Sequence, residues 1–191
     1  MNIAFHRRFL LSSVVGITFL STACTTVETS SRISTKLTAV QFNHVASAYL
    51  ERETSAELWK ASNGATMLHI TFAKYGQGRG GAIFVKGNSA QYSAQLEKFF
   101  EWVRLADERN EMLTKEIGRA PTWVPGGSGN LRFTFHSASV GNHVLQMTTC
   151  TVICIEETAV TVNTIGAREL QRLLLDLDAG KLQGVDATIY R

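Results

Sequence analysis

Residues 55–73 read SAELWKASNGATMLHITFA, and this stretch decides the fold class. The pair Asn63 and Gly64 separates two apolar-containing runs, residues 55–62 and residues 65–73. Because both residues of the pair tolerate positive φ, the pair is the strongest short-range signal for a β-hairpin. In the second run the apolar side chains alternate with polar ones, as in a strand with one buried face: Leu68, Ile70 and Phe72. The stretch therefore predicts two antiparallel strands.

The segments that follow extend this hairpin and add a helix. A Gly-rich turn over residues 75–81 leads to a short apolar run at residues 82–85, which predicts a third strand. Asn88 is then a candidate N-cap with Gln91 three residues later, and apolar side chains recur at helical spacing to at least Arg109. This part of the chain therefore predicts three strands and one helix.

The second half of the chain repeats this order. Residues 121–130 contain both prolines of the chain and predict a long surface loop. Three strands and a helix are predicted after this loop, at residues 131–135, 144–149, 155–162 and 166–179, with Gly180 as the helix stop. Residues 37–53 fit a short helix loosely. We therefore expect an α+β fold, with an antiparallel sheet of about six strands in the order βββα-βββα and two helices packed on one face.

Length and composition indicate one ordinary globular domain. The chain has 191 residues, of which 45% are hydrophobic and 18% charged. The net charge of +3 includes Arg7 and Arg8 of the N-terminal leader, and the chain without them has 17 basic against 16 acidic residues. Nucleic-acid binders carry a clustered basic surface, whereas Lys and Arg are spread among acidic residues here. We therefore exclude a nucleic-acid partner.

The N-terminus has the three parts of an export signal. An apolar run at residues 9–23 follows His6, Arg7 and Arg8 and ends in small residues before Cys24. The run is shorter than the about 20 apolar residues of a membrane-spanning helix, and several serines and threonines interrupt it. We therefore expect a cleaved signal rather than a lasting membrane span.

The last residues of this signal resemble the lipobox of bacterial lipoproteins. Leu20, Ser21, Thr22, Ala23 and Cys24 match its pattern, except that Ser21 stands where Leu is more usual. The resemblance covers residues 1–24 only, and it implies that Cys24 becomes the first mature residue and carries acyl chains. Two or more such chains anchor a protein stably in a membrane. The alternative is an ordinary secretory signal that is cut elsewhere.

The resemblance also implies where the protein resides and how it is divided. In a Gram-negative bacterium, Thr25 after the Cys implies sorting to the outer membrane, facing the periplasm. We expect a signal peptide over residues 1–23, the lipidated Cys24 with a flexible Ser/Thr-rich tether over residues 24–36, and one α+β domain over residues 37–191.

Three segments resemble nucleotide-binding or catalytic motifs, but their neighbouring residues do not fit these motifs. GQGRGG at residues 76–81 matches the dinucleotide fingerprint Gly-x-Gly-x-x-Gly, but the next segment is a predicted strand, whereas the fingerprint must open a helix. Ser128 lacks the second Gly of a nucleophile elbow. Glu156 and Glu157 are adjacent and would point to opposite faces of a strand. We therefore expect no nucleotide, no cofactor and no catalytic residue.

The histidines of the mature chain do not have zinc-ligand spacing, and no Asp lies near them in sequence: His44, His69, His136 and His143. We expect no metal site. His69 and His136 each occupy the polar face of a predicted strand.

Cys150 and Cys154 are the thiols that remain once Cys24 is lipidated. An oxidising envelope favours a disulfide, but in a continuous strand their α-carbons would be about 13 Å apart, beyond the roughly 7 Å that a bridge spans. A turn must fall either at residues 151–153 or at Glu156 and Glu157, because residues 144–162 are too many for one strand. A disulfide-closed hairpin and two buried thiols both remain open.

The sequence predicts an anchor, a tether and a fold, but no group of catalytic residues. We therefore expect a non-enzymatic binding or accessory role, with an envelope protein as partner. The Gly-rich tip around Arg79 and the loop around Trp123 are the exposed candidates for the partner surface. The alternative is a small periplasmic hydrolase or ligand-binding protein whose site forms only in three dimensions. That alternative predicts a deep pocket with at least two of four residues: His69, His136, Glu156 and Glu157.

Overall fold

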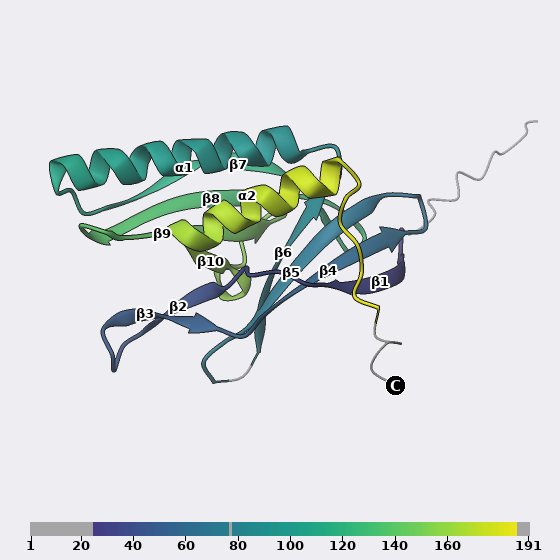
Figure 1. Ribbon diagram of the computed structural model, residues 1–191, viewed down its shortest axis with the longest axis horizontal. Coiled ribbons are helices and arrows are strands. Elements are labelled where there is room, and N and C mark those ends of the chain that lie inside the picture. Colours follow the sequence, from purple (N-terminus) through teal and green to yellow (C-terminus); the bar gives the residue numbers. More distant parts are fainter. Residues whose placement is uncertain (1–24, 77, 187–191) are drawn as a thin grey trace, which may run out of the picture.

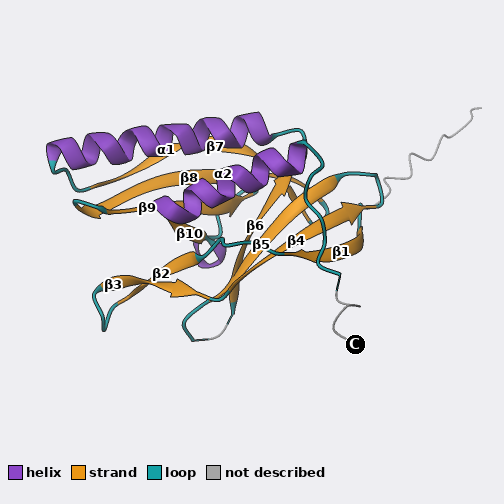
Figure 2. Ribbon diagram, in the orientation of Figure 1, coloured by secondary structure: helices purple, strands orange, loops and turns teal. Residues whose placement is uncertain are grey.

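The computed structural model describes residues 25–76 and 78–186, and it has an α+β fold in which the paired strands are antiparallel (Figures 1 and 2). The predicted signal peptide and Cys24 lie outside these described residues. The strands before the first helix are β1 (Val27–Ile33), β2 (Ala39–Asn43), β3 (Ala48–Arg52), β4 (Thr54–Ala61), β5 (Thr66–Ala73) and β6 (Arg79–Val85). The later elements are α1 (Ser89–Arg109), β7 (Leu113–Val124), β8 (Gly127–Ser139), β9 (Asn142–Cys150), the 3-10 turn η1 (Glu156–Thr158), β10 (Val160–Asn163) and α2 (Thr164–Asp178).

The strands form three sheets, which corrects the prediction of one sheet of six strands in a βββα-βββα order. Two four-stranded sheets have the orders β1-β4-β5-β6 and β10-β9-β8-β7, and β2 pairs with β3 in a separate hairpin. The two larger sheets meet at β6 and β7, where the hydroxyl of Thr122 donates to the carbonyl of Ile83. The hydroxyl of Tyr92 in α1 accepts from the N–H of Val85 and donates to the carbonyl of Pro121. Side chains therefore join the two edges where no strand ladder does.

Both helices lie side by side over the same side of the strands (Figure 1). The side chains between the helices and the sheets are apolar, and most of them are fully buried. They include Leu68, Ile70 and Phe72 of β5, Leu96 and Phe99 of α1, Phe133 and Phe135 of β8, and Leu170, Leu173, Leu174 and Leu177 of α2. The period-two pattern of β5 and the apolar stripe of α2 are confirmed.

Several element predictions hold within a few residues. The hairpin around Asn63 and Gly64 is β4 and β5, the predicted first helix is α1, which ends at Arg109, and the second is α2. Gly180 has a φ of +68° and follows the end of α2. Asn88 is the N-cap residue of α1, as predicted, but its side chain makes no capping hydrogen bond.

Other predictions are wrong, mostly where a strand has little apolar content. The predicted tether contains β1, which pairs with β4 from Val27 to Ile33. Residues 37–53 form the β2–β3 hairpin instead of a short helix. Residues 121–130, predicted as a loop, are the adjoining ends of β7 and β8. The predicted strand at residues 155–162 is η1 followed by β10. Within the described part of the chain, neither helix has the length and apolarity needed to cross a bilayer.

Candidate functional site

A cavity of about 370 Å³ opens beside β6, on the side of the sheets away from the helices, and we call it the β6 groove. One wall is the edge of β6, with Arg79, Gly81 and Ile83, and the opposite wall comes from the end of β7 with Trp123 and from the β7–β8 turn with Pro125. The rest of the lining comes from two places: His69 and Thr71 of β5, and Thr149, Thr151, Ile155 and Thr158 at and after the end of β9.

The groove joins the two segments that the sequence nominated as a partner surface. Arg79 begins β6 and is exposed, whereas Trp123 lies in β7 and is half-buried. The predicted Gly-rich tip is the β5–β6 hairpin. Gly80 lies within β6, where a Cβ would meet Cε1 of Phe72 at 2.0 Å, whereas Gly76 and Gly78 have positive φ and no heavy atom near a Cβ. Gly80 therefore serves close packing, and the groove forms where the hairpin faces the β7–β8 turn.

A disulfide holds the loop at the mouth of the groove. Cys150 and Cys154 are bonded, with their α-carbons 3.9 Å apart, and the N–H of Thr151 donates to the carbonyl of Ile153. The turn therefore falls at residues 151–153, the first of the two predicted places. Its apolar tip faces solvent, with Val152 100% exposed and Ile153 71% exposed. Sequence reasoning did not assign this apolar tip to the partner surface, although the adjacent Val and Ile between two cysteines were a signal for it.

His69 lies in the floor of the groove beneath aromatic side chains. Its ring centroid is 3.9 Å from that of Trp59, which also contacts Trp123 edge to face at 6.5 Å. Nδ1 of His69 is buried without a hydrogen-bond partner among the described residues. Burial lowers the pKa of His69, and the nearby Glu57 charge partly offsets this. Burial therefore disfavours the charged form of the His69 ring.

Glu57 does not complete an acid–base pair with His69. Its carboxylate accepts hydrogen bonds from Nε1 of Trp59 at 2.8 Å and from the hydroxyl of Ser30 at 2.9 Å. These bonds hold the pKa of Glu57 below its ordinary value. The described residues show no hydrogen bond between Glu57 and His69, and the Glu57 carboxylate instead holds the indole of Trp59 in place.

The one permanently charged side chain in the lining is that of Arg79. Within residues 25–76 and 78–186, Arg79 makes no ion pair and no side-chain hydrogen bond. At the end of β5, the ammonium of Lys74 donates to the carbonyl of Glu157, and the Arg52 guanidinium lies 3.9 Å from the ring centre of Tyr75. Arg79 is thus an unpaired cation at the start of β6, across the hairpin from these contacts.

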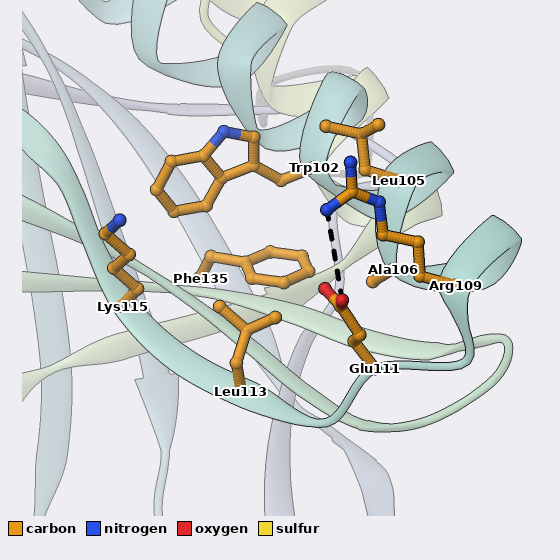
Figure 3. A pocket seen from close by; sticks show the side chains of 8 residues that line it. All are labelled: Trp102, Leu105, Ala106, Arg109, Glu111, Leu113, Lys115 and Phe135. Carbon is orange, nitrogen blue, oxygen red and sulfur yellow. Dashed lines mark ion pairs between the residues drawn. The ribbon is translucent and has the colours of Figure 1, made fainter.

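A second cavity, of about 260 Å³, lies between the C-terminal half of α1 and β7 (Figure 3). Trp102 and Phe135 line it, and Arg109 reaches across its mouth to Glu111, with 3.9 Å between the charged atoms. The ammonium of Lys115 lies 5.5 Å from the ring centre of Trp102. The cations around this cavity already have partners, so the β6 groove is the stronger candidate for binding.

The four residues of the alternative site do not come together. His69 alone of the four lines the β6 groove. His136 bonds Thr114, Glu156 pairs with Arg132, and Glu157 is exposed. His143 is buried against Asp107, with 2.7 Å between Nε2 and the carboxylate. In the part of the chain that the structure describes, no three His, Cys, Asp or Glu side chains are grouped to hold a metal ion.

Comparisons with protein-family models, with curated proteins and with solved structures find no match to this chain.

Proposed function

We propose that this protein is a lipid-anchored envelope protein whose folded domain binds a partner protein through the β6 groove and has no enzymatic role. The observation that carries the proposal is one cavity lined by the unpaired Arg79 and the half-buried Trp123, beside a disulfide loop that contributes Thr151 to the lining. The tip of this loop is apolar and exposed. Aromatic and arginine side chains beside an apolar core are typical of protein interfaces.

The anchoring part of the proposal rests on the lipobox resemblance at Cys24, with the outer membrane, facing the periplasm, as the location if the cell is Gram-negative. The binding part rests on the groove alone. The two parts are independent, because a soluble domain could use the same groove.

The test compares two aspartate variants at equally exposed isoleucines. Ile153 is 71% exposed at the tip of the disulfide loop, and Ile165 is 77% exposed in the first turn of α2, outside the groove. We expect Ile153→Asp to reduce partner capture from native envelopes by about tenfold or more, because a charge then replaces the exposed apolar side chain on the loop that borders the groove. Ile165→Asp should capture as much as wild type.

Capture that is equal for wild type and Ile153→Asp, or no capture above a control that carries only residues 1–36, would contradict the proposal. Circular dichroism of both variants checks that each is folded.

One observation favours the alternative of a ligand-binding protein. Nδ1 of His69 is buried without a partner, beside the indole of Trp59. A small ligand with a hydrogen-bonding group could satisfy this nitrogen. A small molecule from an envelope extract that quenches Trp59 fluorescence in the wild type, but not in His69→Phe, would favour a small ligand over a protein partner.

A further inference from the structure

The hydrogen bonds of β6 alternate between β5 and the groove. In an antiparallel pair, residues that exchange bonds with the partner strand alternate with residues whose N–H and C=O point away from it. Lys86 donates to the carbonyl of Thr66 in the direction of β5. The carbonyl of Ile83 accepts from Thr122, and the N–H of Val85 donates to Tyr92, on the other side. The odd-numbered residues of β6 therefore point away from β5.

By this alternation, the N–H and C=O groups of Arg79 and Gly81 point toward the groove. The N–H of Ile83 points the same way. None of these groups has a hydrogen-bond partner in the part of the chain that the structure describes. The remainder of the edge is closed, because Thr122 and Tyr92 bond to Ile83 and Val85. The open edge therefore runs from Arg79 to Ile83 and coincides with one wall of the groove.

The other edge of the same sheet, on β1, is partly covered. On β1, the N–H of Val185 donates to the carbonyl of Arg32, and Ile33 forms a bridge with Gly184, so the C-terminal segment covers part of that edge. An exposed strand edge is a template for pairing with another chain. The edge of β6 next to the groove is left available for such pairing.

The opposite wall fits the side chains of an added strand. Paired strands lie about 4.8 Å apart, with side chains alternating between the two faces. A strand beside β6 would lie in a groove that is also lined by the apolar side chains of Trp123, Pro125 and Ile155. The unpaired guanidinium of Arg79, at one end of the open edge, supplies the charge that a carboxylate would complement.

We propose that the partner binds as an extended peptide strand that hydrogen-bonds to the edge of β6 at Arg79, Gly81 and Ile83, with a peptide carboxylate on Arg79. This inference rests on the proposed function, since it specifies the chemistry of the partner at the same groove. Backbone hydrogen bonds supply affinity in this mode of recognition, and the side-chain pockets supply selectivity.

The experiment uses the full-length protein in detergent micelles. The probes are synthetic peptides of about six residues, the usual length of a strand, in which valine and threonine alternate and one aspartate is placed at successive positions. Peptide binding is measured by fluorescence polarisation and amide exchange by NMR. We expect exchange at Gly81 and Ile83 to slow by about tenfold on saturation. Val85, whose N–H is already bonded, is the internal control.

N-methylation of single peptide amides separates strand addition from side-chain contact alone. Methylation at alternate positions should weaken binding by about tenfold, because each such methyl removes a hydrogen bond to β6, and methylation at the positions between should not. Arg79→Gln should remove the preference for the aspartate peptide, and Arg79→Lys should restore part of it.

Three results would overturn the inference: no peptide binds, binding does not protect Gly81 and Ile83, or methylation weakens binding equally at both sets of positions. A photo-crosslinking amino acid at Ile153 tells whether the proposed function fails as well. A captured envelope protein that is lost when Arg79→Glu is added would leave the groove as the binding site and refute only the strand mode. No captured protein would refute both.

Discussion

At the scale of single residues, Gly80 has the least room for a side chain among the glycines in the described part of the chain. A Cβ at this position would lie 2.0 Å from Cε1 of Phe72 and 2.7 Å from its Cζ, and Phe72 is buried in the core. We expect Gly80→Ala to lower the free energy of unfolding by about 1–3 kcal/mol, because the ring or the strand must shift. Urea denaturation measures the change.

Gly127→Ala is the matched control for this substitution. Gly127 begins β8, and a Cβ there would have no heavy atom within 4 Å. We expect the free energy of unfolding to change by about 0.5 kcal/mol or less. Equal effects of the two substitutions would show that Phe72 does not set the requirement for glycine.

Single residues also show what the sequence could reveal about the site. Arg79 and Trp123 were recognised as candidates because they lie in glycine- and proline-containing segments, but their proximity depends on how two sheets meet. The open hydrogen-bonding groups of Gly81 have no signature in the sequence, because they follow from the register of β5 and β6. A partner surface could therefore be suggested, and a strand-binding edge could not.

Among the elements, α2 is fastened to the segment between β1 and β2 by Glu169. The carboxylate accepts from Arg172, from the hydroxyl of Thr35 at 2.8 Å and from the N–H of Lys36. The Arg172 guanidinium, followed by the Thr35 and Lys36 bonds, lowers the pKa of Glu169 from 4.5 to about 2, against the opposing effect of burial. The folded state therefore favours the ionised form.

Because the folded-state pKa is the lower one, this stabilisation is fully present above pH 4.5 and is lost as the pH falls toward 2. We expect Glu169→Gln to be less stable than wild type at neutral pH, with the difference shrinking across this window. Urea denaturation at a series of pH values measures it. Glu97→Gln on the exposed face of α1 is the control, and a constant difference at every pH would contradict the prediction.

The disulfide loop is the second element with a measurable contribution. Cys150 and Cys154 close a loop of a few residues, for which the chain-entropy estimate is about 2 kcal/mol. We expect the double variant Cys150→Ser with Cys154→Ser to lose about this much stability and to bind the partner more weakly, because the apolar tip is no longer held at the groove. Thermal unfolding and partner capture measure the two effects, and unchanged capture would separate the loop from binding.

The elements that sequence reasoning missed share a physical cause. In β1 only Ile33 is buried, so its Ser/Thr-rich sequence shows no apolar alternation and was interpreted as a tether. In β7, Pro121 suggested a loop, but β7 is the edge of its sheet, where the missing N–H of a proline is tolerated. Elements with a buried face, such as β5 and α2, were recognised correctly.

For the whole molecule, the first prediction concerns the anchor. We expect the expressed wild-type protein to gain the mass of acyl chains and to sediment with membranes, and Cys24→Ser to do neither, because the proposed attachment is through the Cys24 sulfur. Intact-mass spectrometry and fractionation measure this. If the wild-type protein is soluble and unmodified, the anchor prediction is wrong, and the protein is a free secreted domain.

If Cys24 is lipidated, the strand that replaced the expected tether sets the orientation of the domain. The carbonyl of Thr26 accepts from the N–H of Ser62, and the N–H of Thr26 donates to the Ser62 hydroxyl, so Thr25 alone separates Cys24 from the fold. The β4–β5 turn would then rest at the lipid headgroups. The hairpin that begins the groove lies at the other end of β5, up to roughly 25 Å away. The domain would present its open edge to the aqueous side, and a partner embedded in the same bilayer would have to rise that far to reach it.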